Sequence, residues 1–162
     1  MAAHHLRMTI RIWDTKTGDA VGKPLLGHTE SVHTVAYSPD GQYIISGSIH
    51  TTLQIWDAKT CAAVGKPRKG HIGWICSIIA HSLDGCHIIS GFHDMTIRSW
   101  DAETGTSAVK PLHGHTHRVQ SIVCSPDGRH ITSGPMDKTI WIRDADASAA
   151  VSRSLKAHSH PL

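Results

Sequence analysis

The sequence has little of several features that mark particular classes of protein. One phenylalanine and two tyrosines occur among its 162 residues, and no stretch approaches the ~20 apolar residues of a transmembrane helix. The formal net charge is +3, far from the strongly basic balance of a nucleic-acid-binding domain. We therefore expect neither a membrane protein nor a nucleic-acid-binding protein. The 40% of apolar residues argues against a disordered chain.

Signals for secretion and for disulfide bonds are also lacking. The opening residues hold no apolar core of a secretory signal. The four cysteines, Cys61, Cys76, Cys86 and Cys124, show no CxxC spacing. We therefore expect reduced thiols and an intracellular, cytoplasmic protein. Histidine, by contrast, occurs 15 times. Because histidine titrates near neutrality, we expect the fold to weaken as the pH falls below about 6.5.

What the sequence does contain is a repeat with a period of 43 or 44 residues. Such self-similarity is the signature of a repeat architecture. Its markers are Trp-Asp at Trp13, Trp56 and Trp100, with Arg143 in the next register, Gly-His at Gly27, Gly70 and Gly114, and a Ser-Gly pair ending at Gly47, Gly91 and Gly134. Because these independent markers share one period, the chain is predicted to consist of similar structural units.

Each repeat is predicted to form four short strands. Ser-Pro-Asp-Gly at 38–41 is typical of a β-turn, because proline presets the backbone and glycine adopts a positive φ. In the first complete repeat, β-branched residues favour strands at 43–48 and 52–56. A short fourth strand at 62–65 is predicted to end at Lys66–Pro67. No segment keeps the 3.6-residue period of a helix, so the predicted fold class is all-β.

A unit of this length, bounded by Gly-His and Trp-Asp, resembles the WD repeat of β-propeller proteins. The resemblance implies one WD-repeat region over residues 1–162. Its predicted parts are a half blade at 8–25, blades at 28–67, 71–111 and 115–155, and a C-terminal stub at 157–162. These parts hold 14 strands, too few for the 4–8 four-stranded blades of a typical closed propeller. We therefore expect an incomplete propeller whose exposed blade edges favour self-association.

A short phrase within the repeats resembles a narrower group. Ala63–Pro67 precedes a Gly-His pair, and the same phrase occurs at Ala20–Pro24. It is similar to the repeats of fungal signalling NTPases of the NACHT class, although no NTPase domain is present in this sequence. The resemblance implies a relation to the sensing region of such receptors.

The WD resemblance also implies a buried hydrogen-bonded set of His, Ser, Asp and Trp in each blade. The matching positions are His28, Ser46 and Trp56 in the first blade, His71, Ser90, Asp94 and Trp100 in the second, and His115, Ser133 and Asp137 in the third. The first blade has His50 where Asp is expected, and the third has Arg143 where Trp is expected. Trp141 lies two residues before Arg143, on the same strand face, and is expected to pack nearby without reaching the Asp.

Two patterns resemble enzymatic or nucleotide-binding sites, and we interpret both as structural. Ser90, His71 and Asp94 are the residue types of a hydrolase triad, but the same types recur with the blade period and no G-x-S-x-G motif surrounds the serine. The segment Gly18–Pro24 resembles a phosphate-binding loop. It is one residue too short between its glycines, and proline follows the lysine.

Two other patterns resemble metal and nucleic-acid sites. His113, His115 and His117 alternate along the chain, but no nearby Cys or carboxylate completes a zinc site. The basic cluster at 66–69 lacks interleaved aromatic residues and is interpreted as a solvated loop. We expect no metal, no cofactor and no bound nucleic acid.

In WD proteins, partners dock on loops at one end of the blades, and the resemblance implies such a face here. The matching residues are Ser31, His33, Ile49, Trp74, Cys76, His93, Arg118, Gln120 and Met136. Trp and Arg are the residue types that dominate protein interfaces. The predicted function is a non-catalytic scaffold that binds a protein or peptide. The alternatives are a structural part of a larger propeller with no ligand of its own and, less favoured, a hydrolase using Ser90.

Overall fold

The computed structural model describes residues 8–49, 51–70, 75–80, 87–107, 110–125, 127, 129–135, 139–144 and 153–156. Over these residues the chain forms thirteen strands and no helix. The strands are β1 (Thr9–Trp13), β2 (Ala20–Leu26), β3 (Val32–Tyr37), β4 (Tyr43–Ser48), β5 (Thr52–Asp57), β6 (Ala63–Lys69), β7 (Ile75–Ala80), β8 (His87–Phe92), β9 (Ile97–Asp101), β10 (Val119–Cys124), β11 (His130–Pro135), β12 (Thr139–Asp144) and β13 (Arg153–Lys156).

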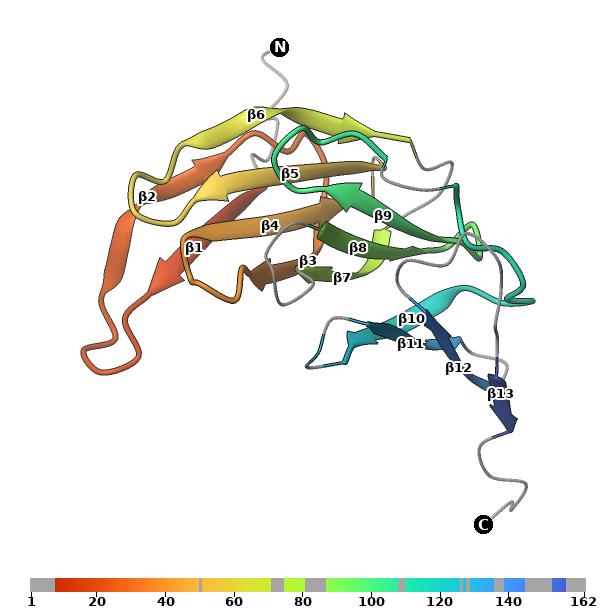
Figure 1. Cartoon of the computed structure of the whole chain (residues 1–162). Coiled ribbons are helices and arrows are strands. Elements are labelled where there is room, and N and C mark those ends of the chain that lie inside the picture. The colour runs from red at the N-terminus through yellow and green to blue at the C-terminus, as the bar shows by residue number, and fades with distance from the viewer. Residues whose placement is uncertain are drawn as a thin grey trace.

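The strands form four antiparallel sheets that follow one another in chain order (Figure 1). β1 and β2 make a two-stranded sheet, β3–β6 and β10–β13 make four-stranded sheets, and β7–β9 make a three-stranded sheet. Where we expected the fourteenth strand, the described residues of the β7–β9 sheet form two isolated bridges, Ile97–Leu112 and Trp100–Ser107. Sequential antiparallel sheets of this kind are the blades of an incomplete β-propeller, and the all-β prediction is confirmed.

The turn between the first two strands of a sheet is built by its own polar side chains. Tyr43 donates its backbone N–H to the Ser38 hydroxyl at 2.8 Å, and that hydroxyl donates to the Asp40 carboxylate. Gly41 has a φ of +70°, which a residue with a Cβ rarely adopts. The Ser125 hydroxyl bonds Asp127 and receives the His130 N–H in the same way. The repeated turn therefore follows from the repeated residues.

The fourth strand differs from the prediction. β6 does not end at Lys66–Pro67 but runs through them to Lys69. Between its pairs Val64–Ile55 and Arg68–Leu53 the register shifts, so β6 carries extra residues here, and Gly65 takes a φ of +69°. Proline is tolerated because β6 is an edge strand, whose outward N–H groups need no partner within the sheet.

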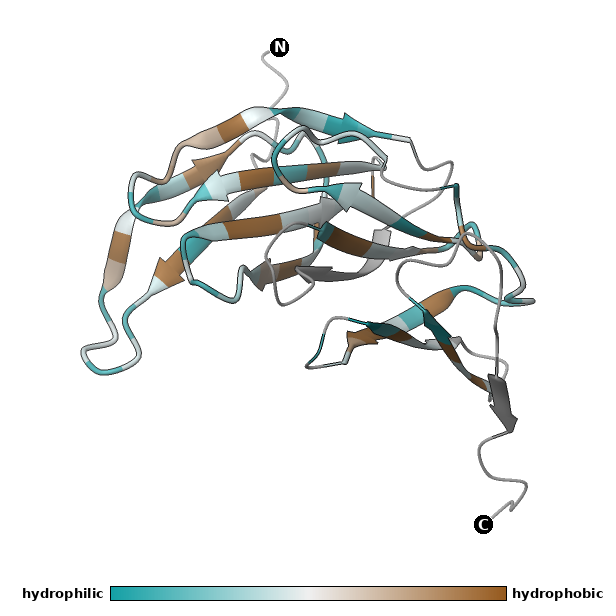
Figure 2. Ribbon diagram, viewed as in Figure 1, coloured by the Kyte–Doolittle hydropathy of each residue, from teal (hydrophilic) through white to brown (hydrophobic). Residues whose placement is uncertain are grey.

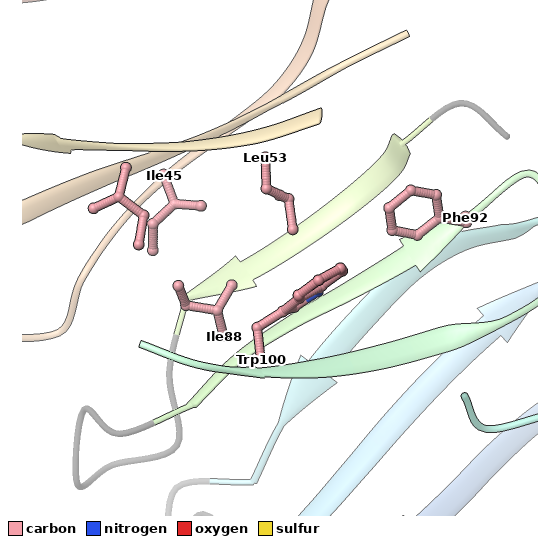
Figure 3. Packing of buried hydrophobic residues seen from close by; sticks show 6 residues of the cluster. Ile45, Leu53, Ile88, Phe92 and Trp100 are labelled. Carbon is pink, nitrogen blue, oxygen red and sulfur yellow. The ribbon is translucent and has the colours of Figure 1, made fainter. Parts of the chain in front are cut away.

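The core lies between successive sheets. Ile45 and Leu53 from the β3–β6 sheet meet Ile88, Phe92 and Trp100 from the β7–β9 sheet (Figure 3). A second cluster joins β7–β9 to β10–β13, and a third joins β1–β2 to β3–β6. Hydrophobic residues accordingly lie within the strands, whereas the turn between β1 and β2 is mainly hydrophilic (Figure 2). Each sheet thus depends on its neighbour to bury one of its faces.

Candidate functional site

The polar centre of the first complete sheet joins three residues that are distant in sequence. His28, which precedes β3, has its Nε2 2.7 Å from the Ser46 hydroxyl on β4. Trp56 on β5 donates its indole N–H to the same hydroxyl at 2.8 Å. Ser46 and Trp56 are fully buried, and His28 is nearly so. The hydroxyl therefore ties the loop before β3 to both central strands of the sheet.

Threonine occupies a part of this centre that our sequence analysis did not anticipate. The Thr52 hydroxyl lies 3.4 Å from His28 Nδ1, the ring nitrogen that does not contact Ser46. His50, which stands at that Asp position, lies outside the described residues. Threonine recurs in the same register at Thr96 and Thr139, and this recurrence is a signal that could have identified it.

The centre of the β7–β9 sheet is described in part. Trp100 donates its indole N–H to the buried Ser90 hydroxyl at 2.7 Å, as Trp56 does to Ser46. Asp94 accepts two hydrogen bonds from Thr96, one from its backbone N–H at 3.0 Å and one from its hydroxyl at 2.6 Å. His71 lies outside the described residues.

The β10–β13 sheet keeps the His–Ser pair but has different residues in the rest of its polar centre. His115 Nε2 lies 2.8 Å from the Ser133 hydroxyl. Trp141 donates its indole N–H to Thr139 at 3.0 Å, and its ring meets the His115 ring edge-on with the centroids 5.3 Å apart. Arg143, 3% exposed, fills the register of Trp56 and Trp100. Asp137 lies outside the described residues.

Arg143 makes its contacts without a described acidic partner. Its Nη2 donates to the His113 carbonyl oxygen at 2.6 Å, and its guanidinium lies 4.9 Å from the Trp141 ring centroid, a cation–π geometry. Its Nε makes no hydrogen bond with the described part of the chain. Burial lowers the pKa of the Arg143 guanidinium, which is the expected penalty for a cation removed from water.

Trp141 and Arg143 together fill the space that Arg98 and Trp100 fill in the β7–β9 sheet. A Cβ added to Gly114 would lie 3.0 Å from Arg143 Nη2 and 3.3 Å from Trp141 Cη2. At the matching Gly70 it would lie 2.9 Å from Trp100 Cη2 and 3.4 Å from Arg98 Nη1. The two side chains have therefore exchanged strand positions while occupying the same volume beside the Gly-His pair.

The buried serines have no access to a substrate. Ser46, Ser90 and Ser133 are at most 1% exposed, and each hydroxyl is already bonded to Trp or His. Burial also lowers the pKa of His28, the histidine beside Ser46. Such residues can stabilise a sheet, but they cannot reach a molecule outside it.

The residues predicted to contact a partner lie on the loops and strand ends at one end of each sheet. The start of each first strand pairs with the end of the second, as in Val32–Ser48, Ile75–Phe92 and Val119–Pro135. The Ile49 N–H donates to the Ser31 carbonyl oxygen at 3.1 Å and joins the two loops there. β7 packs against both β3 and β10, so the first strands of the three sheets are neighbours.

The side chains of this loop face are mainly polar and accessible. His33, His93, Arg118 and Gln120 are exposed, and Ser31 and Ile49 are half-buried. Trp74 and Met136 lie outside the described residues, and Cys76 lies in β7. We call the described members, Ser31, His33, Ile49, His93, Arg118 and Gln120, the loop face.

The basic cluster and Gly22 of the Gly18–Pro24 segment lie in strands. Residues 66–69 belong to β6, and Arg68 donates to the Ala102 carbonyl oxygen at 2.9 Å, which corrects our interpretation of this cluster as a solvated loop. Gly22 lies in β2, an antiparallel strand with the same register shift as β6, rather than in a loop that opens a helix.

Metal-binding clusters and membrane-spanning helices are both absent from the described part of the chain. There, no group of three or more His, Cys, Asp and Glu side chains is arranged to hold a metal ion. Nor do those residues include a helix of the length and hydrophobicity needed to cross a membrane. Cys61 and Cys124 are free thiols.

Comparisons with known proteins agree with the arrangement of the sheets. The family model of the WD domain, G-beta repeat, matches the chain three times, at residues 21–57, 64–101 and 106–144. Among 1231 matching chains of solved structures is the crystal structure of the computationally designed Ika8 protein, with a TM-score of 0.77 and 25% identity. The alignment covers 93% of this chain and 44% of that one. No curated protein sequence matches.

Proposed function

The chain belongs to the WD-domain, G-beta-repeat family, and from this premise we propose that it is a non-catalytic scaffold module that binds a protein or peptide through the loop face. Repeats of this family generally serve protein interaction. The observation that carries the proposal is the gathering of accessible polar side chains at one end of neighbouring sheets. Arginine, the residue type of Arg118, is enriched among the hot-spot residues that dominate the binding energy of interfaces. His33 and Gln120 add hydrogen-bonding groups.

The loop-face proposal is tested with paired variants that differ in position but not in chemistry. Arg118 and His33 are loop-face residues, whereas Arg129 and His130 are exposed at the opposite end of a sheet, where the turn after β10 leads into the first residue of β11. Peptides would be selected from a random display library against the native chain. Their affinities for Arg118→Ala with His33→Ala, and for Arg129→Ala with His130→Ala, would then be measured by calorimetry.

We expect the two loop-face substitutions to weaken peptide binding about tenfold or more, as the loss of hot-spot side chains does. The two control substitutions should leave the affinity unchanged. Equal losses in both pairs, or a loss confined to the control pair, would refute the loop face as the binding surface.

A hydrolase function is disfavoured by the burial of Ser90, which already receives the Trp100 N–H. Ser90→Ala would leave that N–H unsatisfied and should destabilise the protein by about 1–3 kcal/mol. A thermal melt together with an esterase assay separates the two functions. An unchanged melt with loss of a measured hydrolytic activity would overturn the structural assignment of this serine.

A second candidate function is that these sheets form part of a larger propeller and bind no ligand of their own. Apolar side chains such as Val35 and Tyr37 in β3 and Val123 in β10 are about half exposed. The chain also spans only 44% of the designed protein that it resembles. Light scattering distinguishes this candidate, because exposed blade faces should give a heterogeneous mass rather than a defined multiple of 17.6 kDa.

A relation to fungal NACHT-type receptors and an intracellular location are also part of the proposal. The repeated phrase at Ala20–Pro24 and Ala63–Pro67 supports a relation to the sensing repeats of fungal NACHT-type receptors. The free thiols of Cys61 and Cys124 are compatible with a reducing, intracellular location. Expression of a fluorescent fusion in fungal cells would test the location, since a signal outside the cytoplasm would contradict it.

A further inference from the structure

Among the described residues, the exposed carboxylates all lie at one end of the sheets. The tight turns after β1, β3, β5, β9 and β10 share this end, which we call the turn end, and those after β1, β3 and β5 are at the left of Figure 1. Tyr43, the first residue of β4, pairs with Asp57, the last residue of β5, so the turn before β4 and the turn after β5 are neighbours. The exposed carboxylates of the turn end are those of Asp14, Asp19, Asp40, Glu103, Asp127 and Asp144.

The turns themselves require acidic residues. Asp14, Asp57 and Asp101, at the ends of β1, β5 and β9, each accept a backbone N–H of the turn that follows. These hydrogen bonds from the backbone lower the pKa of all three carboxyl groups. Asp40 accepts the Gln42 N–H in the same way. The acidic residues of the turn end therefore have a local cause, and these carboxylates stay ionised in mildly acidic solution.

The end that carries the loop face has exposed cations and histidines instead. His33, His93 and Arg118 belong to the loop face, and His117 is exposed beside Arg118. Lys69 is exposed at the same end, because β6 ends there beside the start of β5. β7 packs against both β3 and β10, so these residues lie on neighbouring sheets. Lysine and arginine are cationic at neutral pH, and histidine as a residue type becomes cationic as the pH falls below neutrality.

The carboxylates described at the loop-face end are shielded. Glu30, in the loop before β3, and Asp94, in the turn after β8, are both half-buried. Asp94 is also engaged by Thr96, whose backbone N–H and hydroxyl both donate to it. At the turn end, by contrast, exposed cations such as Lys59 and Arg129 lie among exposed carboxylates. An approaching anion therefore meets exposed cations without exposed carboxylates among the described residues of the loop-face end.

This separation of charge identifies the chemistry of the partner. Complementary charges steer two molecules together, and like charges placed opposite each other reject the wrong partner. We infer that the loop-face end binds an acidic peptide segment, rich in Glu and Asp, and binds it more tightly at pH 6 than at pH 7.5. This inference rests on the proposed function, because it names the chemistry of the partner that the loop face would bind.

The aromatic side chains favour a peptide over a single-stranded nucleic acid. Nucleic-acid bases bind by stacking on exposed aromatic rings, in addition to the attraction between phosphates and cations. The exposed aromatic residues of the described chain, Trp13, Tyr37 and Tyr43, all lie at the turn end, because they end β1 and β3 and begin β4. No exposed Trp, Tyr or Phe is described at the loop-face end, whereas its Lys69 and Arg118 can each pair with a carboxylate.

The pH dependence follows from the same residues. Between pH 7.5 and pH 6 the histidine residue type gains charge, while Glu and Asp side chains of a peptide stay ionised. His33, His93 and His117 would therefore add positive charge to the loop-face end without loss of charge from the peptide. A bound carboxylate also favours the protonated form of a nearby histidine, so binding and protonation strengthen each other.

The probe is a fluorescein-labelled oligoglutamate peptide, titrated into the full chain and followed by fluorescence anisotropy. An oligolysine peptide of the same length and label is the charge control. We expect the oligoglutamate to bind, with an affinity about threefold or more higher at pH 6 than at pH 7.5, and the oligolysine not to bind. Added salt should weaken the binding, a readout that needs no variant. A thermal melt at both pH values verifies that the chain is folded.

Matched charge reversals locate the binding surface. Arg118→Glu with Lys69→Glu alters the loop-face end, and Arg129→Glu with Lys59→Glu alters exposed cations of the turn end by the same net charge. The first pair should weaken oligoglutamate binding about tenfold or more, and the second should leave it unchanged.

Histidine variants test the pH dependence separately. His33→Gln with His93→Gln should reduce the gain in affinity at pH 6, because both side chains lose the ability to become cationic. His130→Gln, at an exposed position of the turn end, should keep that gain.

Several outcomes would overturn the inference. Equal weakening by both pairs of charge reversals would mean that net charge, and not the loop-face end, holds the peptide. Binding of the oligolysine, or one affinity at both pH values, would contradict the charge argument. Tighter binding of an oligothymidylate than of the oligoglutamate would identify a nucleic acid as the partner.

The library peptides of the proposed function separate the two failures. If they bind and lose affinity in Arg118→Ala with His33→Ala while the oligoglutamate does not bind, the proposed function stands and the acidic partner is wrong. If neither kind of peptide depends on the loop face, both are wrong.

Discussion

The first complete sheet, β3–β6, and the last, β10–β13, have the same strand order but different polar centres. In the first, one serine hydroxyl bonds both His28 and Trp56. In the last, Ser133 keeps its histidine, Trp141 bonds Thr139 instead, and Arg143 fills the tryptophan register. The constant element is the His–Ser pair, which links the loop before the first strand to the second strand.

This difference shows which requirements are chemical and which are steric. The space beside the Gly-His pair must be filled, and either order of an Arg and a Trp two residues apart fills it. The two orders do not satisfy the buried polar groups equally well. In the last sheet a buried cation without a described acidic partner replaces an indole that donates a hydrogen bond to serine. The last sheet should therefore be the weaker of the two.

The largest effect is expected from removing the shared hydroxyl. Ser46→Ala leaves both His28 and the Trp56 N–H without that partner, at about 1–3 kcal/mol for each unsatisfied group. Ser133→Ala removes the partner of His115 but not that of Trp141, so it should cost less. Urea unfolding followed by tryptophan fluorescence measures both, with Thr15→Ala in an exposed turn as the control. Equal losses in the two serine variants would contradict the comparison.

An intermediate effect is expected from exchanging the Trp and Arg of the last sheet. Trp141→Arg combined with Arg143→Trp recreates the order of Arg98 and Trp100. It should raise the free energy of unfolding by about 1 kcal/mol or more, because an indole next to Ser133 replaces a buried cation. The reverse exchange in the β7–β9 sheet, Arg98→Trp with Trp100→Arg, should be destabilising. If the first exchange lowers the free energy of unfolding, Arg143 is better satisfied than its contacts indicate.

The smallest effect is expected from pH. Because burial holds the pKa of His28 below its ordinary value of 6.5, the folded protein binds fewer protons than the unfolded chain near that pH. The stabilisation is complete above pH 6.5 and is lost as the pH falls through the lower folded pKa. The Tm should therefore decrease from pH 7.5 to pH 5, and His28→Gln should reduce that decrease while His130→Gln, at an exposed position, should not. The same decrease in both variants would assign it to other groups.

Much of the fold follows from local patterns that act within one repeat. The strand predicted at 43–48 is confirmed as β4, because β-branched residues and a Ser-Pro-Asp-Gly turn leave few alternatives. The fourth strand was predicted too short, because Lys66–Pro67 looks like a strand terminator in isolation. Its position at the sheet edge, which only the assembled sheet defines, makes the proline acceptable.

The polar centres were less predictable than the strands. His28, Ser46 and Trp56 stand at positions that the repeat marks, but the contact of Thr52 with His28 depends on how the rings lie once the sheet has formed. The exchange of Trp141 and Arg143 was visible in the sequence. Its consequence could be seen only in the folded structure: the Arg143 guanidinium lies over the Trp141 ring and donates a hydrogen bond to the His113 carbonyl oxygen.

The amino-acid order alone determines the repeat and its turns, because each depends on residues within about 43 positions of one another. The tertiary structure decides which apolar faces are buried, because burial depends on whether a neighbouring sheet is present. Val35 and Ile122 occupy the same register in similar strands, yet the first is 46% exposed and the second 4%. The difference lies in the two strands that cover one and not the other.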